Sequence, residues 1–222
     1  MKPKLATGLA ALALGFACAR ALPPPAGPEP VPPVPPAPSE AGEPAAPGPC
    51  LRIERIVVHK GERRLWARCK GGAVVMLPVA LGRAPEGPKR AVGDQRTPEG
   101  EYRVAGPPRA SRFHRFLPID YPSIVDADRA LAEGRLGRDD HARIVAAHRS
   151  GRLPPPNTSL GGALGFHGEG VRWRGESTTL DWTDGCIALA DADLDFLIAR
   201  VGEGTPVSLL GAGAPVPLFA AP

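Results

Sequence analysis

Short apolar runs separated by turn-forming residues dominate the chain after residue 50. Such runs cover residues 51–59, 65–69, 73–82, 101–106 and 204–211. They are rich in β-branched side chains, and turns such as Lys60-Gly61-Glu62 separate them. The pattern predicts a mostly β fold, a sandwich or a barrel, rather than alternating βαβ units.

Three segments with helix signals interrupt or follow these strands. The first is expected to begin after Asp126 and to end before Gly134, and the second to span residues 139–150. The third begins at Asp191, ends at Gly202 and places its leucines on one face. The second helix carries two histidines seven positions apart rather than four, so we expect no metal site there.

The first 49 residues have a different composition. Two lysines, a short apolar run and small residues predict an export signal over residues 1–21. The run is shorter than the ~18 apolar residues that a membrane-spanning helix needs. Cys18 offers an alternative, a lipoprotein signal that ends at this cysteine and leaves a lipid anchor. Nearly half of residues 22–49 are proline, which predicts an extended linker.

Length and composition limit the part of the chain after the linker. With 222 residues and 43% hydrophobic content, the chain can bury one sizeable core, so we expect one domain over residues 50–211 and a tail over 212–222. A net charge of +4 without interleaved basic and aromatic residues argues against nucleic-acid binding. There is no nucleotide-binding glycine loop in the sequence, and we expect no cofactor.

Export also bears on the four cysteines. Cys50 and Cys69 flank a predicted hairpin, whose folding would bring the two thiols within bridging distance. A disulfide between them would leave Cys186 free. The alternative is that both thiols stay reduced and unrelated.

Cys186 has the surroundings of a nucleophile. Gly185 precedes it and apolar residues come after it, as expected for a tight turn that leads into a buried strand. A thiol with a pKa of about 8.5 is only a few per cent thiolate at neutral pH, so it needs a base, and His167 lies upstream. Gly185 also lets backbone N–H groups turn toward a developing oxyanion.

The order and spacing of these residues resemble the catalytic signature of the L,D-transpeptidases (YkuD-type domains). The matching residues are His167, Gly168, Thr183, Asp184, Gly185 and Cys186. An upstream block at residues 89–104, with the sequence GDQRTPEGEY inside it, extends the resemblance to about residues 51–210. The resemblance implies a β-sandwich of the L,D-transpeptidase type with two or three short helices, Cys186 as nucleophile and His167 as base. Gly168, Thr183, Asp184 and Gly185 would shape the site and its oxyanion hole.

The implied function is that of a peptidoglycan L,D-transpeptidase in the periplasm or cell envelope. Cys186 would form a thioester with a tetrapeptide stem, release D-alanine and transfer the acyl group to an amine. One alternative is a cysteine peptidase or hydrolase that cuts wall peptides or a wall-anchored lipoprotein. A second is a non-catalytic wall-binding module in which Cys186 is simply buried.

Substrate recognition is less defined by the sequence. Many family members carry histidine and arginine where this chain has Asp184 and Ala188. We expect Asp184 to pair with an ammonium group of the substrate, or else to be a turn residue. Arg172 and Arg174 lie between base and nucleophile, where they would either clasp a stem-peptide carboxylate or remain solvated.

Overall fold

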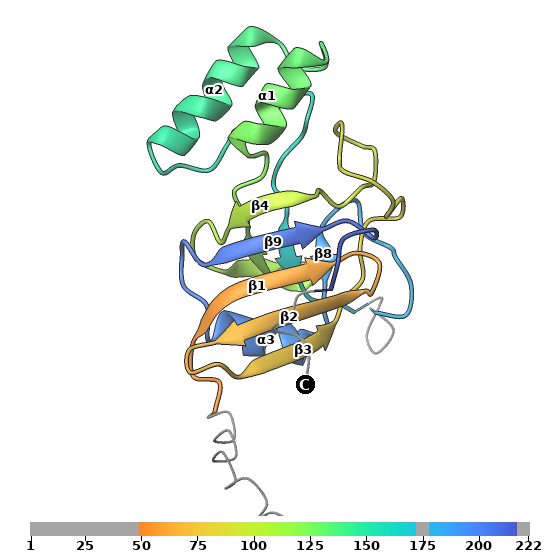
Figure 1. The fold of residues 1–222 in the computed structure, drawn as a ribbon, viewed down its shortest axis with the longest axis vertical. Coiled ribbons are helices and arrows are strands. Elements are labelled where there is room, and N and C mark those ends of the chain that lie inside the picture. The colour runs from red at the N-terminus through yellow and green to blue at the C-terminus, as the bar shows by residue number, and fades with distance from the viewer. Residues whose placement is uncertain (1–48, 172–177, 217–222) are drawn as a thin grey trace, which may run out of the picture. The chain divides into compact units, whose positions relative to one another are not determined.

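The chain folds into two β-sheets and three helices in a computed structural model that describes residues 49–171 and 178–216 (Figure 1). The first sheet has the strand order β3 (Val74–Pro78), β2 (Arg64–Cys69), β1 (Ile53–His59), β9 (Pro206–Leu210), β4 (Gly100–Arg103). The second has the order β5 (Arg109–Ser111), β6 (His114–Pro118), β7 (Gly165–His167), β8 (Ile187–Ala188). Both sheets are mixed, because β1 pairs with β9, and β7 with β8, in parallel. The predicted mostly β fold is confirmed.

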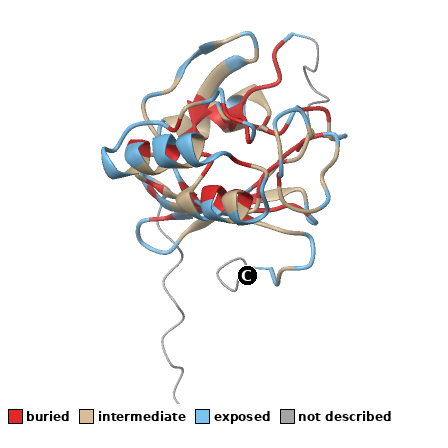
Figure 2. Cartoon of the chain, turned by 90° about the horizontal axis from the view of Figure 1, so that it is seen from above, coloured by how far each residue is buried: buried red, intermediate tan, exposed pale blue. Residues whose placement is uncertain are grey.

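The main core takes side chains from both sheets and from α3 (Asp191–Ile198). Its fully or almost fully buried members include Ile56, Val58, Phe166, Ile187, Leu194, Leu197, Val207 and Leu209. Each large apolar side chain of this kind contributes about 1.5–3 kcal/mol on burial. Figure 2 shows the exposed residues gathered on the outer faces of the helices. This core fixes the positions of β7 and β8 relative to each other.

The first helix, α1 (Ile124–Ala132), starts earlier than the sequence suggested. Ser123 is its N-cap, and its hydroxyl accepts a hydrogen bond from the Asp126 N–H at 3.1 Å. The Asp126 carboxylate in turn accepts from the Ser123 N–H at 3.0 Å, which completes a capping box. Asp126 also accepts from the Tyr102 hydroxyl at 2.9 Å, which fastens α1 to β4.

The other two helices also differ slightly at their ends. Helix α2 (Arg138–Arg149) begins after Gly137 and packs against α1 over a small separate core (Figure 1). Helix α3 begins after Ala190, and Asp191 is not its cap, because the Asp191 carboxylate accepts from the Glu169 N–H at 2.9 Å. It ends at Ile198 rather than at Gly202.

The histidines of α2 serve the packing of the helical pair. His141 Nε2 lies 2.6 Å from Asp128 Oδ1 on α1, and His148 Nε2 lies 2.8 Å from the Pro122 carbonyl oxygen. Each ring is therefore held by a different partner.

Cys50 and Cys69 are joined by a disulfide at the start of the folded domain.

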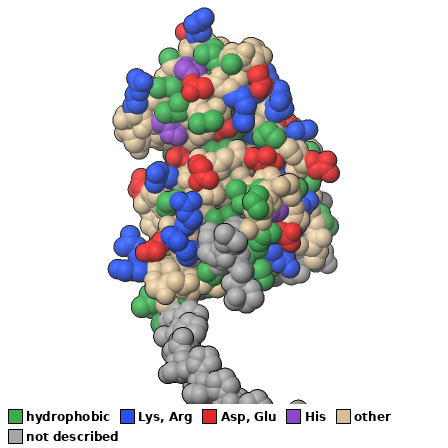
Figure 3. Space-filling view, viewed as in Figure 1, with side chains coloured by type: hydrophobic (Ala, Val, Ile, Leu, Met, Phe, Trp, Pro, Cys, Tyr) green, Lys and Arg blue, Asp and Glu red, His purple; other side chains and the backbone are tan. Residues whose placement is uncertain are grey.

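The predicted signal, Cys18 and nearly all of the proline-rich linker lie outside the described residues. Within the described ranges, no helix is long and apolar enough to cross a membrane. On the face shown in Figure 3, basic and acidic side chains are interspersed rather than gathered into a patch of one sign.

Candidate active site

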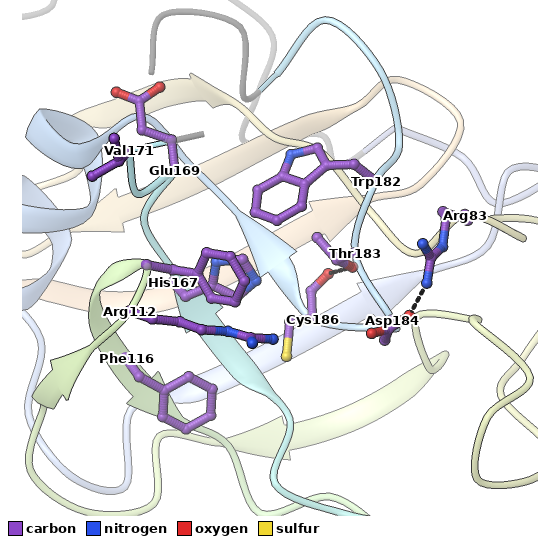
Figure 4. A pocket seen from close by; sticks show the side chains of 11 residues that line it. Arg83, Arg112, Phe116, His167, Glu169, Val171, Trp182, Thr183, Asp184 and Cys186 are labelled. Carbon is purple, nitrogen blue, oxygen red and sulfur yellow. Dashed lines mark hydrogen bonds and ion pairs between the residues drawn. The ribbon is translucent and has the colours of Figure 1, made fainter. Parts of the chain in front are cut away.

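A pocket of about 650 Å³ contains both the predicted nucleophile and the predicted base (Figure 4). His167 is the last residue of β7, and Cys186 immediately precedes β8. The pocket is lined by Arg83, Arg112, Phe113, Phe116, His167, Glu169, Val171, Trp182, Thr183, Asp184 and Cys186. Two segments almost twenty residues apart in the chain thus meet in one cavity.

The alternation of side chains along β7 and β8 explains why the two residues share a face. The strands are parallel neighbours, with Phe166 opposite Ile187. Both of these side chains are fully buried in the core. Because successive side chains point to opposite faces of a strand, His167 lies on the pocket side of β7. Cys186, just before β8, lines the same pocket and also packs against the edge of the core.

The turn before Cys186 is closed by Thr183. Its Oγ1 donates to the Cys186 carbonyl oxygen at 2.7 Å and accepts from the Gly185 N–H at 3.1 Å. Gly185 has a φ of 130°, and a Cβ there would lie 2.7 Å from the Arg96 carbonyl oxygen. Only glycine fits this backbone. The Gly185 N–H is already engaged by Thr183, which differs from the expectation that it faces an oxyanion.

His167 is held as one tautomer. Its Nδ1 lies 2.7 Å from the Gly168 carbonyl oxygen, and since a carbonyl only accepts, Nδ1 carries the proton. In the neutral ring, Nε2 then keeps its lone pair. The imidazole stacks on Phe113 with ring centroids 4.7 Å apart and meets Trp182 edge-on at 5.3 Å. These contacts fix the ring plane.

Burial keeps the His167 imidazole and the Cys186 thiol neutral in the free protein. It lowers the pKa of His167, and the nearby charge of Arg112 lowers it further, against the hydrogen bond to Gly168. Burial of the sulfur raises the pKa of Cys186 to about 11, although the residue as a whole is partly exposed. No hydrogen bond between described residues joins the thiol to the imidazole. The geometry fits a neutral thiol beside a neutral base, and apo sites often tighten only with substrate.

A family model described as the L,D-transpeptidase catalytic domain (YkuD) matches residues 53–209. The chain belongs to this family. The match covers all of the first sheet's strands except the final residue of β9, and it includes the pocket. No curated protein matches the chain.

Several solved structures resemble the domain at low identity. The helical cell shape determining protein Pgp2 from Campylobacter jejuni is 18% identical with a TM-score of 0.46, over 71% of this chain and 47% of that one. An L,D-transpeptidase from Mycobacterium smegmatis is 13% identical with a TM-score of 0.41, over 72% of this chain and 59% of that one. This chain therefore spans about half to three-fifths of the length of these two proteins.

The two positions that depart from the L,D-transpeptidase pattern have structural partners here. Asp184 forms an ion pair with Arg83, which lies on the same side of the pocket (Figure 4). The pairing of Asp184 with a substrate ammonium group stays a prediction. Ala188 is fully buried against Ala80 and Trp182. A small residue at position 188 leaves room for the indole that packs on His167.

Other predicted site residues have different outcomes. Gly168 is next to the base, where a Cβ would lie 2.2 Å from Asp191 Oδ1. Arg172 and Arg174 lie outside the described residues. Sequence reasoning missed the pocket residues Arg83, Arg112, Phe113, Phe116, Glu169, Val171 and Trp182. Of these, Glu169 and Trp182 stand directly beside motif residues, Gly168 and Thr183.

The pKa of Cys186 predicts how its reactivity depends on pH. Alkylation by iodoacetamide is expected to rise about tenfold per pH unit between pH 7 and 10 without levelling off, because only the thiolate reacts. Peptide mapping of the Cys186 peptide measures this rate. The same chain in denaturant is the control, since its rate should level off above a pKa of about 8.5. A plateau below pH 8 in the folded chain would instead indicate a preformed thiolate–imidazolium pair.

Proposed function

We propose that this chain is a peptidoglycan L,D-transpeptidase with Cys186 as nucleophile and His167 as general base. The donor is a tetrapeptide stem, and the products of the first step are an acyl-enzyme and D-alanine. Membership of the L,D-transpeptidase family supports the reaction class. The shared pocket of the two side chains supports their roles.

In the first step, the sulfur of Cys186 attacks the carbonyl carbon before the terminal D-alanine. The thiol proton passes to Nε2 of His167 as the S–C bond forms, so neither group has to be charged beforehand. We assign the Cys186 N–H to the oxyanion, because the Gly185 N–H already donates to Thr183. The C–N bond then breaks, and the proton on Nε2 goes to the amine of the departing D-alanine.

In the second step, an amine of a neighbouring stem attacks the thioester carbonyl. Nε2 accepts a proton from this amine, a new amide bond forms, and the thiol of Cys186 takes a proton back. Water is the competing nucleophile, and its attack would make the chain a wall peptidase. The ratio of transfer to hydrolysis depends on how the acceptor amine is held.

The observation that carries this proposal is the hydrogen bond from His167 Nδ1 to the Gly168 carbonyl oxygen. It leaves Nε2 unprotonated in the neutral ring, as a general base requires, and His167 lines the pocket. A merely structural histidine buried to this degree would have no need to line a cavity beside a free thiol.

We further propose that the protein acts in the cell envelope after export. The support is the predicted signal over residues 1–21 and the substrate class of the family. The Cys50–Cys69 disulfide fits an oxidising compartment. Retention by lipid at Cys18 remains an alternative to cleavage.

Intact-mass analysis after incubation with tetrapeptide muropeptides tests the function. We expect a covalent adduct equal to the donor minus D-alanine, a crosslinked product when an amine acceptor is present, and neither with Cys186→Ala. A tripeptide product without crosslinks would instead identify a peptidase. A folded chain that forms no adduct and releases no D-alanine would be a non-catalytic module.

A further inference from the structure

Arg112 lies in the turn between β5 and β6 and extends into the pocket from the side of His167 and Phe116 (Figure 4). Its guanidinium carbon sits 4.7 Å from the centroid of the Phe113 ring. The same ring stacks on the His167 imidazole at 4.7 Å. The arginine is thus linked to the proposed base through a single aromatic ring.

The turn that carries Arg112 is fastened on both sides. The Phe113 N–H donates to Ser111 Oγ at 3.0 Å, and the Phe113 carbonyl oxygen accepts from the Gly168 N–H at 3.0 Å. Because Gly168 comes directly after the proposed base, the turn and the base are parts of one rigid unit. The backbone that carries the Arg112 side chain is therefore held in place at the pocket wall.

The charge of Arg112 is not neutralised by the residues that the structure describes. On the other side of the pocket, Arg83 is paired with Asp184. Arg112 forms no ion pair with a described carboxylate, and its contact is with the face of the Phe113 ring. A cation–π contact uses none of the guanidinium's five N–H donors, which stay available for a ligand.

We propose that Arg112 binds a carboxylate of the acyl donor close to the scissile bond, an inference that rests on the proposed function. A tetrapeptide stem has a terminal carboxylate one residue beyond the attacked carbonyl, and a second where its third residue is a diamino diacid. A planar guanidinium matches a carboxylate with two parallel hydrogen bonds. Both groups are carboxylates, and the experiment below distinguishes the terminal carboxylate from the one on the diamino acid.

The test measures the second-order rate constant for acylation of Cys186 by three tetrapeptide donors. One donor has all carboxylates free, one is amidated at its terminus, and one is amidated at the diamino acid's side-chain carboxyl. Arg112→Gln is expected to slow acylation by the free donor on the order of 10- to 100-fold. It should have little further effect on the donor that lacks the bound carboxylate, and Arg112→Lys should retain part of the rate.

Arg109→Gln is the matched control. Arg109 belongs to the same hairpin and sits 4.9 Å over the Phe116 ring, but it does not line the pocket. This variant should acylate at the unmodified rate with every donor. Because Arg112 is exposed, its variants should also keep the unmodified melting temperature.

The donors distinguish binding from an indirect effect on the base. If Arg112 acted only through the pKa of His167, Arg112→Gln would change the rates of all three donors by the same factor, and the inference would be overturned. Equal rates for Arg112→Gln and the unmodified chain would overturn it as well. If the unmodified chain is not acylated by any donor, the proposed function itself has failed and this inference falls with it.

Discussion

The His167→Ala variant is expected to acylate Cys186 about 10²- to 10⁴-fold more slowly than the unmodified chain, the usual range for a lost general base. The thiol has a pKa of about 11, so at neutral pH very little thiolate forms without a proton acceptor. Nε2 of His167 is the acceptor that the tautomer leaves free. Stopped-flow release of D-alanine, or adduct formation by mass, measures the loss.

The controls for this variant have to separate chemistry from packing. The His167 side chain is 3% exposed and lies between two aromatic rings, so alanine also removes packing, and rates must be expressed per folded molecule. His167→Gln fills more of the space without supplying a base and should be equally slow. His141→Ala, on α2 and paired with Asp128, should be fully active. Full activity per folded His167→Ala molecule would show that the ring is structural.

The sequence predicted the first sheet better than the second. Strands β1, β2 and β3 are long and apolar, with glycine turns between β1 and β2 and between β2 and β3, so their pattern is visible locally. Strands β5 and β6 escaped prediction because β5 has only three residues and the first three residues of β6 are exposed or half-buried. Strand β6 is fixed by its pairing with β7, which lies almost fifty residues away, and β5 pairs with β6 alone. Local propensity does not contain that information.

The same distinction applies to the site. Cys186 and His167 could be picked out because nucleophile and base have a spacing that the family shares. Arg112 and Phe113 reach the pocket only because β6 pairs with β7 and brings the hairpin turn beside the base. Arg83 likewise reaches Asp184 through the backbone pairing of Arg83 with Thr183. Residues that complete a site by long-range pairing carry no local signal.

Helix starts were misplaced for a related reason. Asp126 has the chemistry of a cap, but it sits three residues inside a capping box that begins at Ser123. Asp191 also resembles a cap, yet its carboxylate serves the Glu169 N–H beside the base. In both cases an aspartate that resembles an N-cap accepts a hydrogen bond from a backbone N–H and is not itself the N-cap residue. The hydrogen bond that Asp191 accepts from the Glu169 N–H supports the turn after His167.

The Gly185→Ala variant is expected to lose both stability and activity. A φ of 130° is strained for any side chain, at a cost of about 1–3 kcal/mol, and the new Cβ would lie 2.7 Å from the backbone oxygen of Arg96. Together these effects should lower the melting temperature by roughly 5–15 °C for a domain of this size. Relief of the contact would shift the turn that holds Cys186, and a displacement near 1 Å can slow catalysis about 10²-fold.

Gly106→Ala separates the backbone strain from the contact. Gly106 has a φ of 113°, close to that of Gly185, but no atom lies within 4 Å of the position of its Cβ. Its variant should therefore show a smaller loss of stability, from strain alone, and unmodified acylation of Cys186. Thermal unfolding and adduct formation measured on both variants give the comparison. If Gly185→Ala melted and reacted like Gly106→Ala, the close approach of Arg96 would not be what positions the nucleophile. A larger loss in both measurements at Gly185 is expected, because there a rigid backbone oxygen, rather than a flexible side chain, opposes the methyl group.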